Sequence, residues 1–288
     1  MAGSLGVKAT PFTYAAHALA VAAATMVLVW CIHFRGGLAF EAVNKNLIFN
    51  VSLPSSASFF SSPSCNATAP SYRLMFASVA SHVTVMWQLC EQRELLDACL
   101  HPVFMLIGYI IIGSEAIMIY KSIPGLNHDT AKLIHLILHA IAIVCGAFGI
   151  YCAFKNHNES GIANLYSLHS WLGIGAISLY GIQWIFGFIT FFFPGAAPDV
   201  RRGALPWHAL FGLFVYILTL ATSQLGFLEK LTFLESSGAV EKYGPEALLV
   251  NFTALVVVLF GAAVVVAAVA PAAKVDEPEG YAAIPVIA

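Results

Sequence analysis

The sequence predicts an all-α integral membrane protein with six transmembrane helices. Of the 288 residues, 59% are hydrophobic and only 10% are charged, whereas soluble domains carry about 25% charged residues. A helix needs about 20 apolar residues to cross a bilayer. Six stretches of the chain provide them: 12–34, 101–120, 133–154, 166–193, 206–227 and 248–270. We therefore expect a single membrane domain over residues 1–288, with the lipid bilayer as its surroundings.

The first stretch is expected to be retained as a helix. The residues before it lack the positively charged segment and the small-residue cleavage site of a cleaved signal peptide. Trp30, His33 and Phe34 close this stretch, and amphipathic residues of this kind collect at membrane interfaces. The net charge of the whole chain, −2, gives no indication of a nucleic acid or another strongly charged partner.

Residues 52–100 differ in composition from the stretches around them. The first part is rich in Ser and Pro, and polar residues interrupt the mildly apolar part from Leu74 to Cys90. The segment is therefore a poor candidate for a span, and it is too short to bury a core of its own. We expect an atypical inserted loop between the first and second helices. Its cysteines could pair in an oxidising lumen, but their spacing does not settle this point.

The second and third helices carry the next polar groups within apolar surroundings. Glu115 lies near the far end of the second helix, where it is expected either to pair with a basic group such as Lys121 or to lie at the interface. In the third helix His135 and His139 are four residues apart, so they share one face. Zinc ligands can have this spacing, but no further acidic or histidine ligand accompanies the pair on the same helix.

The fourth and fifth helices repeat one arrangement. Gly173 follows His169 by four residues, and Gly212 follows His208 by four residues, so each glycine shares a helix face with a histidine. A missing side chain there would let a flat macrocycle lie close to the backbone. Close helix packing through small residues is the alternative. The sixth helix is rich in Val and Ala and is expected to be a packing helix.

Four histidines lie at matching depths in four successive spans. His101, His135, His169 and His208 each lie near the start of their own helix, where an imidazole marks a functional site by default. Consecutive helices joined by short loops run antiparallel. The histidines of helices two and four therefore share one side of the membrane, and those of helices three and five share the other. At 1.5 Å per residue, the two pairs are separated by roughly 20 Å in depth.

This arrangement predicts two metal cofactors stacked across the bilayer. Haem iron accepts axial histidines, and two of them fill both axial positions, which suits electron transfer. A different class of function also uses histidines within spans. A transporter could employ them for proton relay or metal binding. The pairing by depth favours the redox protein, and a reducible b-type absorption spectrum of the purified sample would separate the two classes.

At these positions the sequence resembles the cytochrome b561 family of transmembrane ascorbate-dependent oxidoreductases, in particular its plant members. The resemblance covers nearly all of the chain except 52–100. It rests on four motifs: Phe34-Arg35-Gly36-Gly37-Leu38-Ala39, the stretch from Lys132 to His135, Tyr166-Ser167-Leu168-His169-Ser170-Trp171-Leu172-Gly173, and Pro206-Trp207-His208. The resemblance implies two haem b groups, a four-helix core of helices two to five that holds them, and a homodimer.

The resemblance also implies the direction of electron transfer and the substrates. Cytosolic ascorbate would give one electron, which would cross to monodehydroascorbate or a ferric chelate in a lumen or apoplast. Both termini would be cytosolic, in a vacuolar membrane, another endomembrane or the plasma membrane. The four potential N-glycosylation triplets all fall on the face opposite the termini, which agrees with this orientation.

Substrate residues follow from the resemblance by position. The ascorbate site would use Lys132 with Arg201 or Arg202, which we place in the loop before the fifth helix. The acceptor site would use His157 and Asn164, in the polar loop 155–164. The chain departs from the family pattern at Ala131, where a second lysine is frequent. Juxtamembrane charge is the alternative interpretation of the three cations.

Overall fold

The computed structural model describes residues 8–35, 100–123 and 125–271, and within these ranges the regular structure is helical, without strands. Six helical segments are long and apolar enough to cross a membrane, as predicted. The predicted loop 52–100 lies outside the described residues except for Leu100, which opens the second span.

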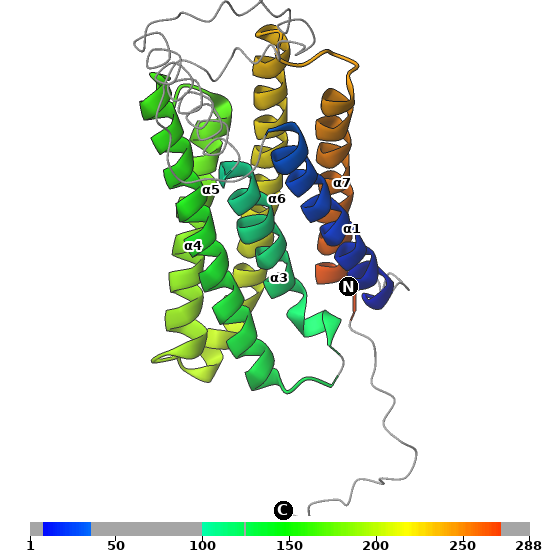
Figure 1. Cartoon of the computed structure of the whole chain (residues 1–288). Coiled ribbons are helices and arrows are strands. Elements are labelled where there is room, and N and C mark those ends of the chain that lie inside the picture. The colour runs from blue at the N-terminus through cyan, green and yellow to red at the C-terminus, as the bar shows by residue number, and fades with distance from the viewer. Residues whose placement is uncertain (1–7, 36–99, 124, 272–288) are drawn as a thin grey trace, which may run out of the picture.

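The six spans follow one another in alternating directions (Figure 1). α1 (Thr10–Val29) continues into a π-helical turn, η1 (Trp30–Phe34). The second span contains the π-helical segment η2 (Phe104–Ile111) and α3 (Ile112–Ser122). The remaining helices are α4 (His128–Ser160), α5 (Leu168–Gly187) with its π-helical end η3 (Phe188–Phe192), α6 (Pro198–Ser236) and α7 (Pro245–Val269).

Local sequence signals fix several helix ends. The side chain of Asn127 accepts a hydrogen bond from the backbone N–H of Asp129 at the start of α4, and Ser167 caps α5 in the same way through the N–H of Ser170. α4 ends at Ser160 and is capped by Gly161, whose φ of 68° is left-handed and suits glycine. α6 and α7 both begin with a proline, which needs no backbone donor in the first turn.

Two helices extend beyond the predicted spans. α4 continues to Ser160, so most of the predicted loop 155–164 is helical and His157 lies on the last turn of α4. α6 begins at Pro198, so Arg201 and Arg202 lie on this helix and not in a loop. Hydropathy marks where a segment leaves the apolar layer, whereas backbone hydrogen bonding can carry the helix further into polar surroundings. Even Pro206 is accommodated within α6.

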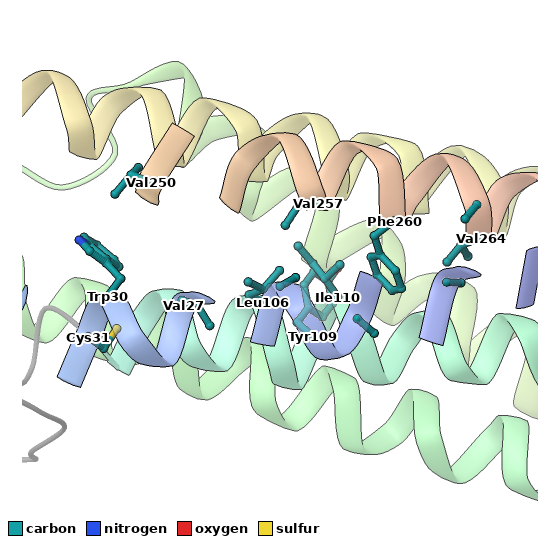
Figure 2. Close-up of a cluster of buried hydrophobic side chains, with 14 of the residues drawn as sticks. Val27, Trp30, Cys31, Leu106, Tyr109, Ile110, Val250, Val257, Phe260 and Val264 are labelled. Atoms are coloured by element: carbon teal, nitrogen blue, oxygen red, sulfur yellow. The ribbon is translucent and has the colours of Figure 1, made fainter. Parts of the chain in front are cut away.

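The helices form a four-helix group with a helix pair beside it. The second span, α4, α5 and α6 form the group, and α1 and α7 pack together along one side of it (Figure 1). Figure 2 shows the buried cluster between α1, α7 and the second span, with Val27, Leu106, Tyr109 and Phe260 among its members. Alanines at 16, 20 and 23 line the buried face of α1, and small residues of this kind let membrane helices approach closely.

Both described termini lie at one end of the bundle, which is the lower end in Figure 1. The backbone N–H of Ala9 donates to the carbonyl of Pro271, at 3.1 Å. The α3–α4 and α5–α6 connections lie at this lower end, whereas the α4–α5 and α6–α7 connections lie at the upper end. The two ends therefore present different sets of polar residues to the two sides of a membrane.

Candidate haem sites and substrate-binding ends

The first histidine pair lies toward the upper end of the bundle. His101, at the start of the second span, and His169, in the first turn of α5, have ring centroids 6.0 Å apart with an interplanar angle of 88°. The Nδ1 of His101 donates to the carbonyl of Gly149 on α4, at 2.8 Å. The Nδ1 of His169 donates to the carbonyl of Thr222 on α6, at 2.9 Å. Four different spans thus meet at this pair.

The second pair lies toward the lower end. His135 on α4 and His208 on α6 have ring centroids 6.3 Å apart with an interplanar angle of 67°. The Nδ1 of His135 donates to the carbonyl of Ala116 on α3, at 2.8 Å. The Nδ1 of His208 faces the side-chain amide of Gln183 on α5, at 2.9 Å. The structure therefore brings the four histidines together in the combination that their depth predicts.

The hydrogen bonds of the imidazoles prepare one ring nitrogen for a metal. In three of the four rings Nδ1 meets a backbone carbonyl, so it has to carry the proton, and Nε2 keeps its lone pair. Metal-binding histidines usually have such a partner on the other ring nitrogen, because it fixes both the tautomer and the orientation of the ring. His208 differs, because the atom that faces its Nδ1 is the amide nitrogen of Gln183, a donor that also donates to the backbone carbonyl of His208, at 2.6 Å.

The distances fit an iron ion held between each pair. A bond between a metal ion and an imidazole nitrogen is about 2 Å long, so two imidazoles on opposite sides of one ion have ring centroids about 6 Å apart. The separations of 6.0 and 6.3 Å agree with this value. The residues present therefore suit two bis-histidine haem sites.

The separation of the two sites can be read from the helices that they share. On α4, His135 belongs to the lower pair, whereas Gly149 accepts from the upper pair. On α5, His169 belongs to the upper pair and Gln183 contacts the lower pair. Each helix has 14 residues between its two contacts, which corresponds to roughly 21 Å along the helix axis. This value agrees with the depth that the sequence predicts.

The three cations predicted for the ascorbate site lie at the lower end. Lys132 is half-buried in the second turn of α4, and its Nζ lies 5.8 Å from the centroid of the Phe192 ring in η3. Arg201 and Arg202 lie in the first turns of α6, one half-buried and the other exposed. The amino ends of α4 and α6 add the positive poles of two helix dipoles. This end of the bundle suits an anion.

The residues predicted for the acceptor site lie at the upper end. His157 is half-buried on the last turn of α4, and its ring centroid lies 6.5 Å from that of Tyr166. Asn164 is close enough to hydrogen-bond with His157, and its amide also donates to the side chain of Asn158, at 2.7 Å. The structure therefore gathers both predicted residues over the His101–His169 pair.

Sequence reasoning missed two further groups at the acceptor end. Glu229 and Lys230, in the upper part of α6, lie near His157. Partial burial raises the pKa of Tyr166, and the adjacent Glu229 carboxylate, which accepts its hydrogen bond, acts in the same direction. Tyr166 is therefore a neutral donor at physiological pH. Glu229 follows His208 by 21 residues on one helix, but only the tertiary contacts show that it reaches the loop before α5.

Two other histidines, His139 and His17, contact protein side chains and belong to neither pair. His139 packs against His135, and its Nδ1 hydrogen-bonds with the Tyr180 hydroxyl, at 2.5 Å. The described part of the chain contains no group of three or more His, Cys, Asp or Glu side chains arranged to hold a metal ion, which argues against a zinc site here. His17 on α1 contacts Glu115, with 2.9 Å between Nε2 and Oε2.

Of the two alternatives that the sequence left open for Glu115, pairing with Lys121 is not the one observed. Lys121 does not reach this carboxylate; its Nζ donates instead to the carbonyl of Ala270, at 3.0 Å. The carboxylate and the imidazole of His17 come from helices nearly one hundred residues apart in the sequence. Sequence spacing identifies neighbours within one helix, but it does not identify groups that meet across two helices.

Comparison with known proteins gives one consistent result. Residues 100–234 match the family described as eukaryotic cytochrome b561. A protein of Oryza sativa subsp. japonica, named probable ascorbate-specific transmembrane electron transporter 2, is 70% identical over 286 residues, which cover 99% of this chain and 100% of the relative. The chain belongs to the cytochrome b561 family. Membership in this family implies a b-type haem, and the two histidine pairs offer places for it.

More distant relatives are also similar to this chain. Transmembrane ascorbate ferrireductase 1 of Arabidopsis thaliana is 53% identical over 262 residues, which cover 91% of this chain and 88% of the relative. A human protein named transmembrane ascorbate-dependent reductase CYB561 is 38% identical over 164 residues, covering 57% of this chain and 65% of the relative. The similarity thus extends from plants to animals.

Proposed function

We propose that this cytochrome b561 is a transmembrane oxidoreductase that transfers electrons from ascorbate on one side of a membrane to an acceptor on the other. Two histidine pairs at two depths of one bundle carry the proposal, since a single pair would serve only one side. His135 and His208 would hold one haem b, and His101 and His169 a second. Haem b held by these imidazoles would supply one-electron redox chemistry.

The two ends of the bundle have the chemistry of a donor and an acceptor site. Lys132, Arg201 and Arg202 would bind the ascorbate anion at the lower end, which we place in the cytosol together with both termini. His157 and Asn164 would bind monodehydroascorbate or a ferric chelate at the upper end, in a lumen or the apoplast. There Lys230, near His157, adds a positive charge that suits an anionic acceptor.

We place the protein in a vacuolar membrane, another endomembrane or the plasma membrane, as a homodimer. The outward surface of α5 and η3 carries large apolar side chains: Trp171, Ile182 and Ile189 are each more than half exposed in the single chain. Such a face requires lipid or a second copy. The transporter alternative lacks comparable support, because the histidines pair in twos across helices and no cluster of three or more ligands occurs in the described ranges.

Single replacements of the four histidines test the proposal. His135→Ala and His208→Ala should each remove the same haem, whereas His101→Ala and His169→Ala should remove the other. The remaining haem should still give a reducible b-type absorption spectrum. His139→Ala is the matched control, because the half-buried His139 imidazole contacts His135 but belongs to neither pair.

Three results would contradict the proposal. Loss of the same haem from His135→Ala and His169→Ala would overturn the pairing. Haem loss from His139→Ala would show that the ligand lies one turn away from His135. A folded, colourless wild-type protein would point to the transporter class. Sealed vesicles loaded with ascorbate, with a ferric chelate outside, should then show whether reduction of the external iron requires both pairs.

A further inference from the structure

α5 and α6 carry the same pattern of four residues, and the two helices run in opposite directions. In each helix a histidine is followed by a glycine after four residues, a hydrogen-bonding residue after 14 and a second glycine after 18. The positions are His169, Gly173, Gln183 and Gly187 in α5, and His208, Gly212, Thr222 and Gly226 in α6. A spacing of 18 residues is about five helical turns, so each histidine shares a face with its distant glycine.

Because the two helices pack against each other in opposite directions, each histidine meets the second glycine of the other helix. A Cβ added at Gly226 would lie 2.8 Å from the Cε1 of His169, and one at Gly187 would lie 3.0 Å from the Cε1 of His208. A methyl group at 226 would thus overlap the imidazole of His169, and one at 187 would press tightly on that of His208. Each glycine provides the space in which an imidazole lies.

The hydrogen-bonding residues explain why the rings lie there. Thr222, whose carbonyl accepts from the Nδ1 of His169, is one turn before Gly226. Gln183, whose amide faces the Nδ1 of His208, is one turn before Gly187. An imidazole whose Nδ1 reaches Thr222 or Gln183 lies over the next turn of the same helix. The residue on that turn, Gly226 or Gly187, therefore has to lack a side chain. The ring orientation and the glycine therefore depend on each other.

The first glycine of each pattern has a different role. A Cβ at Gly212 would lie 3.3 Å from the Nε2 of Gln183, and one at Gly173 would lie 3.7 Å from the Cγ2 of Thr222. These two glycines, which the sequence suggested as candidates for contact with a macrocycle, lie against residues of the neighbouring helix that contact the histidine of the glycine's own helix. The contact at Gly173 is ordinary van der Waals packing, whereas the contact at Gly212 is tight but longer than those at Gly187 and Gly226.

We propose that Gly226 and Gly187 are positioning residues that set the orientation of the His169 and His208 rings, each for one haem site. The proposal rests on the proposed ligand roles of these histidines. It predicts a site-selective effect, because each glycine contacts one imidazole of one pair. Alanine is a better helix former than glycine, so a loss caused by Gly→Ala cannot come from weakened helix propensity.

The test compares Gly226→Ala and Gly187→Ala with alanine replacements at Gly181 in α5 and Gly203 in α6. A Cβ at either control position meets nothing within 4 Å. Haem content of each site is measured by redox-resolved absorption spectroscopy of detergent-solubilised full-length protein, and fold by size-exclusion chromatography. Electron paramagnetic resonance adds a direct readout, because the spectrum of a low-spin ferric haem depends on the angle between its two imidazole planes.

We expect Gly226→Ala to weaken haem retention at the His101–His169 site and to alter its resonance signal, while the other site stays intact. Loss of a group that orients a metal ligand commonly lowers affinity by roughly 10- to 100-fold. Gly187→Ala should do the reverse, with a smaller effect because its contact is 3.0 Å instead of 2.8 Å. Both controls should match the wild type in haem content and spectrum.

The outcomes separate this inference from the ligand assignment. His169→Ala and His208→Ala, measured in parallel, establish which haem each ligand serves. If these variants lose their haems while the glycine variants keep wild-type spectra, the positioning role is wrong and the ligand roles stand. Loss of both haems from Gly226→Ala also contradicts the inference, because a general packing defect is not site-selective. If His169→Ala keeps both haems, the ligand assignment itself is wrong.

Discussion

Lys132, Arg201 and Arg202 show how single residues acquire a role from their position. Each is an ordinary juxtamembrane cation in the sequence, but the structure places all three in the first turns of α4 and α6, before the His135 and His208 positions of these helices. Lys132 is further held near the Phe192 ring, in a cation–π contact. Because the proposed donor is an anion, these charges are expected to act mainly on its binding and encounter.

We expect Lys132→Ala combined with Arg201→Ala to raise the half-saturating ascorbate concentration by roughly 3- to 10-fold, since partly exposed ionic contacts are each worth up to about 1 kcal/mol. Stopped-flow reduction of the purified protein measures this change. Added salt should weaken the wild-type reaction more than that of the double variant. Lys8→Ala, an exposed cation at the same end, should leave the kinetics unchanged. Equal kinetics of the double variant and the wild type would show that these residues are juxtamembrane charges without a role in ascorbate binding.

His17 and Glu115 form a second residue-scale pair, outside the haem sites. Their side chains are partly exposed on the surface of the single chain, at 43% and 30%, and each is a hydrogen-bond partner of the other. The Nδ1 of His17 also lies 2.5 Å from the carbonyl of Thr13. The pair therefore provides each polar group with a hydrogen bond where hydrocarbon would offer none.

Glu115→Leu should destabilise the protein by about 1–3 kcal/mol, because it leaves the His17 imidazole without its side-chain partner. The double variant with His17→Leu should recover part of this loss, since neither polar group then remains unpaired. Thermal unfolding in detergent, followed by loss of the haem absorption, provides the comparison. Strictly additive effects of the two changes would show that the contact contributes nothing.

At the scale of elements, one contact joins the upper end of α1 to the start of α7. The guanidinium of Arg35 donates to the Glu246 carboxylate, and the Trp30 indole donates to the same carboxylate oxygen, at 2.8 Å. Both charged side chains are only 13% exposed. α1 and α7 also bury the Val27 and Val257 cluster between them (Figure 2). The ion pair thus fixes the register of two helices that packing holds together.

Glu246→Ala should cost about 3–5 kcal/mol of stability, because it leaves the buried Arg35 without a counter-charge. Glu246→Gln keeps an acceptor for Trp30 and should cost less. The melting temperature in detergent reports both effects, and the haem spectra should stay normal at low temperature because the contact lies outside the four-helix group. Haem loss from Glu246→Ala in a still-folded protein would contradict this separation of roles.

At the scale of the whole molecule, the two pairs and the two polar ends make electron transfer a movement of charge across the bilayer. Moving one elementary charge through the full membrane potential changes its free energy by about 2.3 kcal/mol per 100 mV. Transfer from a cytosolic donor outward is favoured when the cytosol is negative. The direction of this dependence follows from the orientation that we propose.

Vesicles with ascorbate inside and a ferric chelate outside should therefore reduce iron faster when a potassium gradient makes their interior negative. Reversing the gradient should slow the reaction. A variant that lacks the upper pair, such as His169→Ala, should lose external iron reduction while its remaining haem is still reduced by ascorbate. Rates that ignore the imposed potential would indicate that a step without net charge movement limits the turnover.

Composition and spacing were sufficient to predict the six spans and the partners of the four histidines. Apolar stretches of sufficient length have to cross the bilayer as helices, because hydrocarbon leaves backbone groups no other partner. Short connections then force alternating directions, so the depth of His101 determines that it faces His169 and not His135. These conclusions need only distances along the chain. The ends of α4 and α6 differ from the prediction, because these helices continue past the apolar stretch.

Only the tertiary structure decided which helix faces meet. The contacts of His17 with Glu115, of Arg35 with Glu246 and of the His169 ring with Gly226 each join helices that are far apart in the sequence. A Cβ at Gly203 would meet nothing, whereas one at Gly226 would meet an imidazole. This difference depends on how the neighbouring helix is rotated and shifted. The packing of all six helices together sets that rotation, so no local pattern in the chain encodes it.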